Sequence, residues 1–152
     1  GDFYFESYMI PDADLPEGDL RLLTVDNPLV IPANKNVQIL ITAGDVLHSW
    51  AVPSMGIKTD AVPGRLNETW VNVKEPGTYR GQCSEICGTG HGFMPVVVKV
   101  LPENEFMAWV NEAKNNYAIN EDIQPITSSE NEEELVLSKN DVLKLEFEEN
   151  KL

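Results

Sequence analysis

The sequence has no long hydrophobic run and is poor in cysteine, histidine and basic residues. Its longest unbroken apolar stretch is only a few residues, whereas a helix that spans a bilayer needs roughly 20. Only 11 Lys and Arg stand against 25 Asp and Glu, which gives a formal net charge of −14. This acidity argues against nucleic acid as a partner. The chain has two cysteines and two histidines, so a dense disulfide framework is excluded and a metal site has few soft ligands available.

Familiar enzyme motifs are missing as well. No internal repeat, phosphate-binding loop, nucleophile triad or paired-carboxylate motif stands out, and 152 residues allow one domain with a core and an appendage.

The negative charge is unevenly spread: residues 1–102 carry 12 acidic and 7 basic side chains, and residues 103–152 carry 13 and 4. Such a surface favours a basic protein partner, which it would attract in a salt-dependent way.

One short segment, QCSEICGTGHGFMP, gathers most of the metal-binding residue types. It places Cys83, Cys87, His91 and Met94 at intervals of four, four and three residues. Thiolate and thioether stabilise Cu(I), and imidazole binds copper in either oxidation state, whereas zinc sites seldom use methionine. A blue-copper site needs one cysteine, so two thiolates four residues apart indicate a pair of bridged copper ions, with one histidine for each.

The second histidine must come from elsewhere, and His48 in GDVLHSWAVPS is the only other one in the sequence. A backbone carbonyl between the cysteines, such as that of Glu85, can fill a remaining position. Simpler interpretations compete: a disulfide between Cys83 and Cys87, a structural zinc site, or core packing of His48 and Met94.

The residues then resemble a known family. The segments CSEICGTGHGFMP, DVLHSWAVPSMGIKTDAVPGRLN, SYMIP and RLLTVDN are similar to the copper-binding domain of cytochrome c oxidase subunit II of the mitochondrial type, over residues 5–109. The resemblance implies a binuclear copper centre, Cu-A, that accepts single electrons from cytochrome c and passes them to haem in subunit I. The ligands it implies are His48, Cys83, the backbone carbonyl of Glu85, Cys87, His91 and Met94.

The same resemblance implies further sites. The side chain of Glu85 matches a ligand for a magnesium ion shared with subunit I. Asp26 and Asp45 match acidic positions that face cytochrome c, and Asp60 and Arg65 fall in a segment that packs against subunit I. For each carboxylate, a solvated surface charge is the alternative. Oxygen reduction and proton pumping belong to subunit I, so the chain is expected to be a subunit of an oxidoreductase without being catalytic alone.

Family members carry two amino-terminal transmembrane helices and an aromatic run of the form WYW, where electrons are thought to enter. Neither is found in this sequence. We expect a separate amino-terminal polypeptide of a split subunit II to supply them, with a processed or truncated fragment as the alternative. The domain would then face the intermembrane space as part of complex IV of the mitochondrial inner membrane, among its other subunits, or the periplasm in a bacterium.

Short β-branched and aliphatic runs predict strands at 20–25, 36–43, 46–52, 69–73, 78–82 and 95–101, separated by turn residues. The polar and apolar residues of 36–43 mix in the manner of a half-buried strand. We therefore expect an all-β, cupredoxin-like Greek-key sandwich or barrel, antiparallel in its pairing, over residues 1–101. Gly81, Gly88, Gly90 and Gly92 are expected to supply turns around the ligand loop.

Beyond the strands the pattern becomes helical. An apolar stripe of Phe106, Trp109, Val110 and Ala113 predicts a packing helix over 102–117, opened by Pro102. Residues 118–152 form an acidic extension, with a linker at 127–134 and a hairpin, or a short helix from Ser138, within 135–147. This extension is expected to dock on another subunit, with a solvated tail as the alternative.

Two rival functions remain at this point. One is a Cu-A domain of the nitrous oxide reductase type, although the copper-binding loop of that family lacks the SEIC sequence found here. The other is a copper-binding or thiol-redox assembly module that delivers copper to the oxidase. Trp50 and Trp70 are both expected in the core and are not substitutes for the aromatic run.

Overall fold

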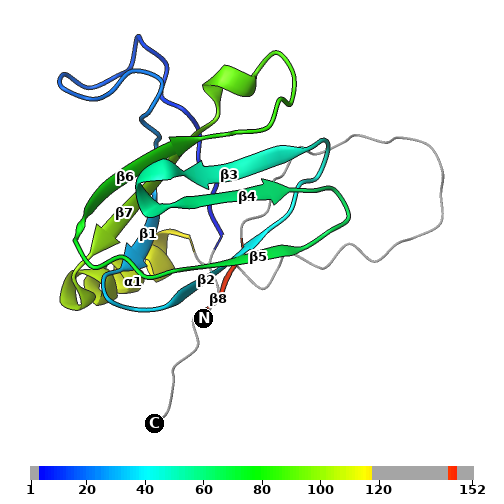
Figure 1. The fold of residues 1–152 in the computed structure, drawn as a ribbon. Helices are drawn as coiled ribbons and strands as arrows, with labels where there is room; N and C mark the ends of the chain where they lie inside the picture. Colours follow the sequence, from blue (N-terminus) through cyan, green and yellow to red (C-terminus); the bar gives the residue numbers. More distant parts are fainter. Residues whose placement is uncertain (1–3, 118–143, 147–152) are drawn as a thin grey trace, which may run out of the picture.

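The computed structural model describes residues 4–117 and 144–146, which form a β sandwich with one helix packed on its outside (Figure 1). The strands and the α-helix in chain order are β1 (Leu29–Pro32), β2 (Val37–Ile41), β3 (His48–Val52), β4 (Ile57–Ala61), β5 (Asn67–Val71), β6 (Gly77–Gln82), β7 (Pro95–Leu101), α1 (Glu103–Asn116) and β8 (Lys144–Glu146), with short 3₁₀ helices at Pro53–Met55 and His91–Phe93.

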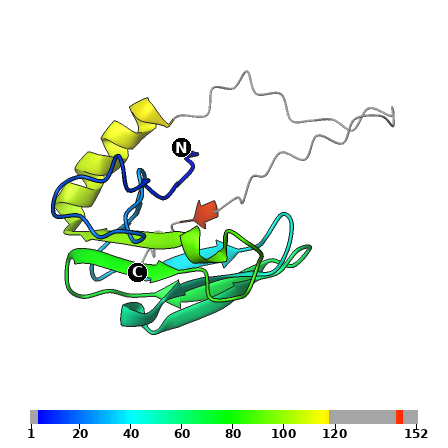
Figure 2. The same ribbon diagram turned by 90° about the horizontal axis from the view of Figure 1, so that it is seen from above.

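The strands pair into two three-stranded sheets and one hairpin. The sheets have the orders β1-β7-β6 and β5-β2-β8, and β3 pairs with β4. The pairing is antiparallel except between β1 and β7, which run parallel. The expectation of a wholly antiparallel sandwich was therefore wrong at this pair. β3 packs on β6 and β4 on β5, so the hairpin lies against both sheets (Figures 1 and 2).

The core lies between these layers and consists of small aliphatic side chains. β2 alternates buried and half-buried positions, as the mixed pattern of 36–43 predicted, because successive side chains of a strand point to opposite faces. The buried cluster comprises Leu29, Ile31, Ala33, Val37, Ile39, Ile41, Ala43, Val52, Ala61, Val71, Val98 and Val100. Burial of this apolar surface is the main force that holds the ligand-bearing strands together.

The predicted strands at 36–43, 46–52, 69–73, 78–82 and 95–101 all overlap observed strands. Two strands were not predicted. β1 is wholly buried but only four residues long and bounded by Pro28 and Pro32, and β4 reads IKTDA, with two charges in five residues. Short or charged segments carry too little periodicity to be recognised from the sequence.

The predicted strand at 20–25 was wrong. Only Val25 makes a bridge, to Met9, and Leu22 adopts a positive φ of 64°, which an extended strand does not allow. β-branched and aliphatic residues form a strand only where a neighbouring strand offers hydrogen bonds. Here the chain folds as turns, and the side chain of Arg80 donates to the carbonyl of Leu23 at 3.0 Å.

Helix α1 begins after Pro102, with Glu103 and Glu105 in its first turn, where carboxylates favour the positive end of the helix dipole. It packs against β1 and β7 (Figure 2). In the described ranges, no helix is both long and apolar enough to cross a membrane.

Of the carboxy-terminal extension, only 144–146 lies within the described residues. These residues form β8, which pairs antiparallel with β2 through Gln38, Ile39 and Leu40. The expected linker at 127–134 and the remainder of the hairpin or helix within 135–147 lie outside the described residues.

Phe106 anchors α1 on the sandwich and gives a first prediction. It is 7% exposed and stacks near Trp109, with ring centroids 6.0 Å apart. Phe106→Ala should lower the free energy of unfolding by about 3 kcal/mol, because it removes a buried ring and leaves a cavity. Met107→Ala, at a neighbouring position that is 53% exposed, should change it by less than about 0.5 kcal/mol. Urea titration followed by circular dichroism checks both, and equal losses would contradict the packing role of Phe106.

Candidate metal centre

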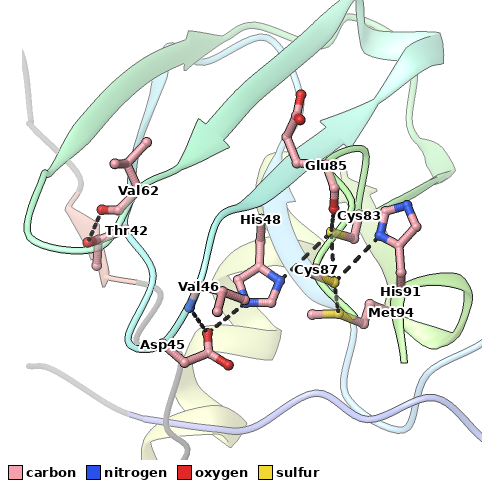
Figure 3. A network of polar contacts seen from close by, with 10 residues as sticks. All are labelled: Thr42, Asp45, Val46, His48, Val62, Cys83, Glu85, Cys87, His91 and Met94. Atoms are coloured by element: carbon pink, nitrogen blue, oxygen red, sulfur yellow. Dashed lines mark hydrogen bonds and ion pairs between the residues drawn. The ribbon is translucent and has the colours of Figure 1, made fainter. Parts of the chain in front are cut away.

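The histidines, cysteines and methionine expected to bind copper meet where β3 begins and β6 ends (Figure 3). His48 is the first residue of β3, Cys83 directly follows β6, and Met94 directly precedes β7. Cys87 lies in the loop between, and His91 begins a single 3₁₀ turn. The backbone N–H of Cys83 donates to the carbonyl of Met94 at 3.0 Å, so the two ends of the loop continue the β6–β7 ladder. The sandwich therefore holds the loop at both ends.

Within this loop the polar atoms are close together. Cys83 Sγ lies 3.9 Å from Cys87 Sγ and 3.9 Å from His48 Nδ1. Cys87 Sγ lies 3.5 Å from both His91 Nδ1 and Met94 Sδ. Both thiols are free, and 3.9 Å is far longer than a disulfide bond. The ligand atoms of His48, Cys83 and Cys87 all lie within 4.8 Å of one another, which is close enough for them to share a metal site.

The two thiols differ in their environments. Cys83 is only 8% exposed, and burial on its own would raise its pKa. Hydrogen bonds with the backbone at Glu85 and Ser49, and with both imidazoles, outweigh this and lower the pKa of Cys83 to about 7. The pKa of Cys87 is raised, first by desolvation and then by the neighbouring Cys83 sulfur. Near neutral pH, one sulfur of the pair is thus readily a thiolate, the form that binds metal.

His48 is held by a carboxylate. Its side chain is 12% exposed, and its Nε2 lies 2.7 Å from Asp45 Oδ1. The same oxygen accepts a hydrogen bond from the backbone N–H of Val46 at 2.7 Å. These hydrogen bonds, that of His48 first, lower the pKa of Asp45. Asp45 was expected at the docking surface for cytochrome c, and its contact with His48 was not foreseen, although the three-residue spacing of the two could have indicated it.

Glu85 presents different groups to two neighbours. Its backbone carbonyl lies 3.3 Å from Cys83 Sγ, at the edge of the cluster. Its side chain accepts a hydrogen bond from Lys58 Nζ at 2.7 Å, and Lys58 also binds Asp60 at 2.8 Å. This contact was missed from the sequence because Lys58 lies in β4, which was not recognised as a strand. The Lys58 ammonium lowers the pKa of Asp60.

The other expected partner-binding residues do not join the cluster. Asp26 is exposed and its carboxylate accepts the backbone N–H groups of Tyr8 and Asn27, both at 2.7 Å, so it also orders the amino-terminal segment. Arg65 lies in the turn after β4, where its backbone N–H donates to the carbonyl of Val62 at 3.1 Å.

The two tryptophans have different positions. Trp50 is half-buried and packs against the core cluster, as expected. Trp70 is 52% exposed and its indole N–H donates to Glu68 at 2.8 Å, so the expectation that it lies in the core was wrong. Trp70 in β5 pairs with Gln38 of β2. Both residues lie on the face of the sheet that points away from the buried cluster.

A β sandwich that brings two thiols, two imidazoles and a thioether together at one end defines a cupredoxin-like metal-binding domain, and this donor set is of the kind copper prefers. Comparison with protein families matches residues 1–101 to cytochrome c oxidase subunit II, periplasmic domain. The chain belongs to that family.

Relatives agree with this assignment. Cytochrome c oxidase subunit 2 of Arabidopsis thaliana is 57% identical over 107 residues, which cover 70% of this chain and 41% of that protein. The probable cytochrome c oxidase subunit 2 of Rickettsia prowazekii is 56% identical over 116 residues, 76% of this chain and 37% of that protein. The chain thus spans about two fifths of the length of these curated relatives.

Solved structures give the same result. The periplasmic domain of subunit II of the cytochrome oxidase of Bradyrhizobium japonicum superposes with a TM-score of 0.71 at 46% identity, covering 78% of this chain and 82% of that one. A mixed-disulfide intermediate between a thioredoxin-like protein and subunit II of cytochrome c oxidase gives 0.67 at 43%, covering 78% and 80%. These confirm the cupredoxin-like fold class.

Proposed function

We propose that this chain is the electron-transfer domain of a cytochrome c oxidase, holding a binuclear Cu-A centre that accepts electrons from cytochrome c and passes them to haem a in subunit I. The observation that carries the proposal is that every cysteine and histidine of the chain meets Met94 at one end of the sandwich, with His48 at the start of β3 and the other four on the loop between β6 and β7. The oxidase as a whole reduces oxygen to water and pumps protons. In it, this domain is a relay and not the site of oxygen chemistry.

The residues expected to hold the metal fit its chemistry. His48, Cys83, Cys87, His91 and Met94 supply soft and borderline donors, and the carbonyl of Glu85 faces the same cluster. When bound, the copper pair supplies a one-electron acceptor and donor.

The fold supplies rigidity around these donors. The loop is closed by the hydrogen bond from Cys83 to Met94, and the backbone N–H of Ser84 contacts the carbonyl of Ser49 at 3.4 Å. Each ligand-bearing strand packs on the buried core. Donors that are fixed in this way need little rearrangement when the charge of the site changes, which suits fast electron transfer.

The acidity of the chain and the exposed apolar side chains next to ligand residues support cytochrome c as the partner. Val46, Leu47, Ile86 and Phe93 flank ligand residues in the sequence and are between 45% and 83% exposed. The chain carries a net charge of −14. In this proposal Asp26 and Asp45 contribute to long-range steering of a basic partner, and the apolar side chains make the close contact.

The magnesium proposal concerns the other side of the cysteine loop. Glu85 would supply a carboxylate to an ion shared with subunit I, and Asp60 and Arg65 would face that subunit. The ion pair between Lys58 and Glu85 supports a polar contact region at this position. Lys58 Nζ contacts Oε1 of Glu85 at 2.7 Å, so magnesium would bind the other carboxylate oxygen or take the place of Lys58. The match to a periplasmic domain and the nearly equal identities with a plant and a bacterial relative support a location on the intermembrane-space side of the mitochondrial inner membrane, or on the periplasmic side in a bacterium.

The test is electron paramagnetic resonance with copper analysis of the purified chain after loading with equal amounts of Cu(I) and Cu(II). We expect two coppers per chain and a seven-line hyperfine pattern, because one unpaired electron would be shared by two equivalent nuclei. A four-line pattern with one copper, or binding of zinc in preference, would contradict the proposal. Repeating the measurement on the native oxidase shows whether a missing partner, rather than a wrong assignment, explains a failure to load.

A second candidate is a thiol-redox or copper-delivery module, favoured by the two free thiols 3.9 Å apart and by the mixed disulfide named for one structural relative. The same measurement separates the candidates. A mixed-valence copper pair is purple and paramagnetic, whereas a Cu(I) carrier is colourless and silent.

A further inference from the structure

The two ring nitrogens of His48 have different neighbours, and this difference determines which of them can bind a metal (Figure 3). Nδ1 lies 3.9 Å from Cys83 Sγ, on the side of the cluster, and Nε2 lies 2.7 Å from Asp45 Oδ1, on the opposite side. The imidazole is therefore between the thiol and the carboxylate.

A neutral imidazole carries one N–H, and an ionised carboxylate can only accept a hydrogen bond. The short contact with Asp45 consequently places the hydrogen on Nε2 and leaves the lone pair of Nδ1 facing the sulfurs. The carboxylate is itself held, because Oδ1 also accepts the backbone N–H of Val46 at 2.7 Å. Asp45 thus fixes both the tautomer and the ring orientation.

We infer that Asp45 is a positioning residue for the copper site: its carboxylate holds His48 as the Nε2–H tautomer, with Nδ1 ready to bind metal. Carboxylates that hydrogen-bond to a metal-ligating histidine also raise the basicity of the ligand nitrogen. The inference rests on the proposed function, and it assigns Asp45 a role that docking of cytochrome c does not require. With 56% of its side chain exposed, Asp45 can present its other oxygen to a partner at the same time.

The first test uses the unmodified, metal-free chain. Long-range ¹H–¹⁵N correlation spectra of the histidine rings report directly which nitrogen carries the hydrogen. We expect the Nε2–H form for His48, and an Nδ1–H form would overturn the inference. This measurement does not depend on copper loading, so it remains decisive even if the proposed function fails.

The second test compares Asp45→Ala with Asp45→Asn by copper affinity and by reduction potential. Asp45→Ala removes the acceptor, so affinity should fall about 10–100-fold and the fixed tautomer should be lost. Asp45→Asn keeps a carbonyl oxygen in place but removes the charge, so it should largely restore both. Asp26→Asn, which alters the other proposed docking carboxylate, should leave tautomer, affinity and potential unchanged.

A docking role alone predicts another pattern. Both Asp45 variants, like Asp26→Asn, would then slow the reaction with cytochrome c to a similar extent at low salt, with no change in tautomer or copper affinity. That result would overturn the inference while leaving the two-copper spectrum of the unmodified chain intact. If Asp45→Ala does not fold, the tautomer of His48 in the unmodified chain still decides the question, because an Nδ1–H form would overturn the inference.

Discussion

Cys83→Ser is expected to abolish the two-copper spectrum and to leave the fold in place. Cys83 Sγ contacts both His48 and the Glu85 carbonyl, and it lies 3.9 Å from the other thiol. Its pKa of about 7 makes the thiolate accessible at neutral pH, whereas a serine hydroxyl stays protonated and is a hard, weak ligand for copper. The measurement is electron paramagnetic resonance with copper analysis after loading.

The control for this substitution is Ser84→Ala in the same loop. Ser84 is exposed and its hydroxyl donates only to the carbonyl of Gln82, at 3.1 Å, among the contacts in the described part of the chain. It should load two coppers like the unmodified chain. A Cys83→Ser variant that keeps two coppers and the seven-line pattern would show that Cys83 does not bridge them, and the proposed centre would have to be reassigned.

Much of the candidate site could be predicted from the sequence because four of its residues lie within twelve positions of one another. Cys83, Cys87, His91 and Met94 are on one loop, so the fold has little freedom to separate them. His48 lies 35 residues upstream of Cys83. It was identified by elimination, since His91 is the only other histidine in the sequence, and by the family resemblance. The structure brings it within 3.9 Å of Cys83.

The contacts around the ligands were harder to predict. The ion pair of Lys58 with Glu85 spans 27 residues and depends on β4, whose charged sequence gave no strand signal. The role of Asp45 was assigned by charge and by the family resemblance, whereas the folded chain turns its carboxylate towards His48. Sequence patterns show which residues have suitable chemistry, but the pairing of side chains across strands depends on register, which tertiary packing determines.

Surface and edge positions were the other source of error. Trp70 was placed in the core, yet large aromatic residues are rarely fully buried and Trp70 is 52% exposed in β5. The apolar run at 20–25 was assigned to a strand, but Leu22 has a positive φ and the segment packs as turns. In both cases the residue types favour the predicted structure, but packing against neighbouring segments determined where the residues lie.

Gly81 was expected to supply a turn, and its position inside β6 gives the second large prediction. A Cβ on Gly81 would lie 1.7 Å from the backbone oxygen of Ala51 in β3 and 2.9 Å from the Cα of Val52. Both are main-chain atoms of a packed strand and cannot rotate away. The absence of a side chain at Gly81 is therefore what lets β6 approach β3, two residues before Cys83.

Gly81→Ala is expected to lower the free energy of unfolding by more than about 3 kcal/mol, beyond the usual range of about 1–3 kcal/mol for overpacking, because backbone must move. The ligand-bearing strands would separate, so copper loading should fall as well. Denaturation by urea and copper analysis measure both effects.

Gly90→Ala is the matched control, since Gly90 is in the ligand loop, has a φ of −84° and has open space within 4 Å of the position that a Cβ would take. It should change stability by less than about 0.5 kcal/mol and still load copper. If Gly81→Ala were as stable as Gly90→Ala, the close approach of β3 and β6 would not be what positions His48 against Cys83. If Gly81→Ala were folded but unable to load copper, the close approach of β3 and β6 would matter more for copper binding than for the stability of the domain.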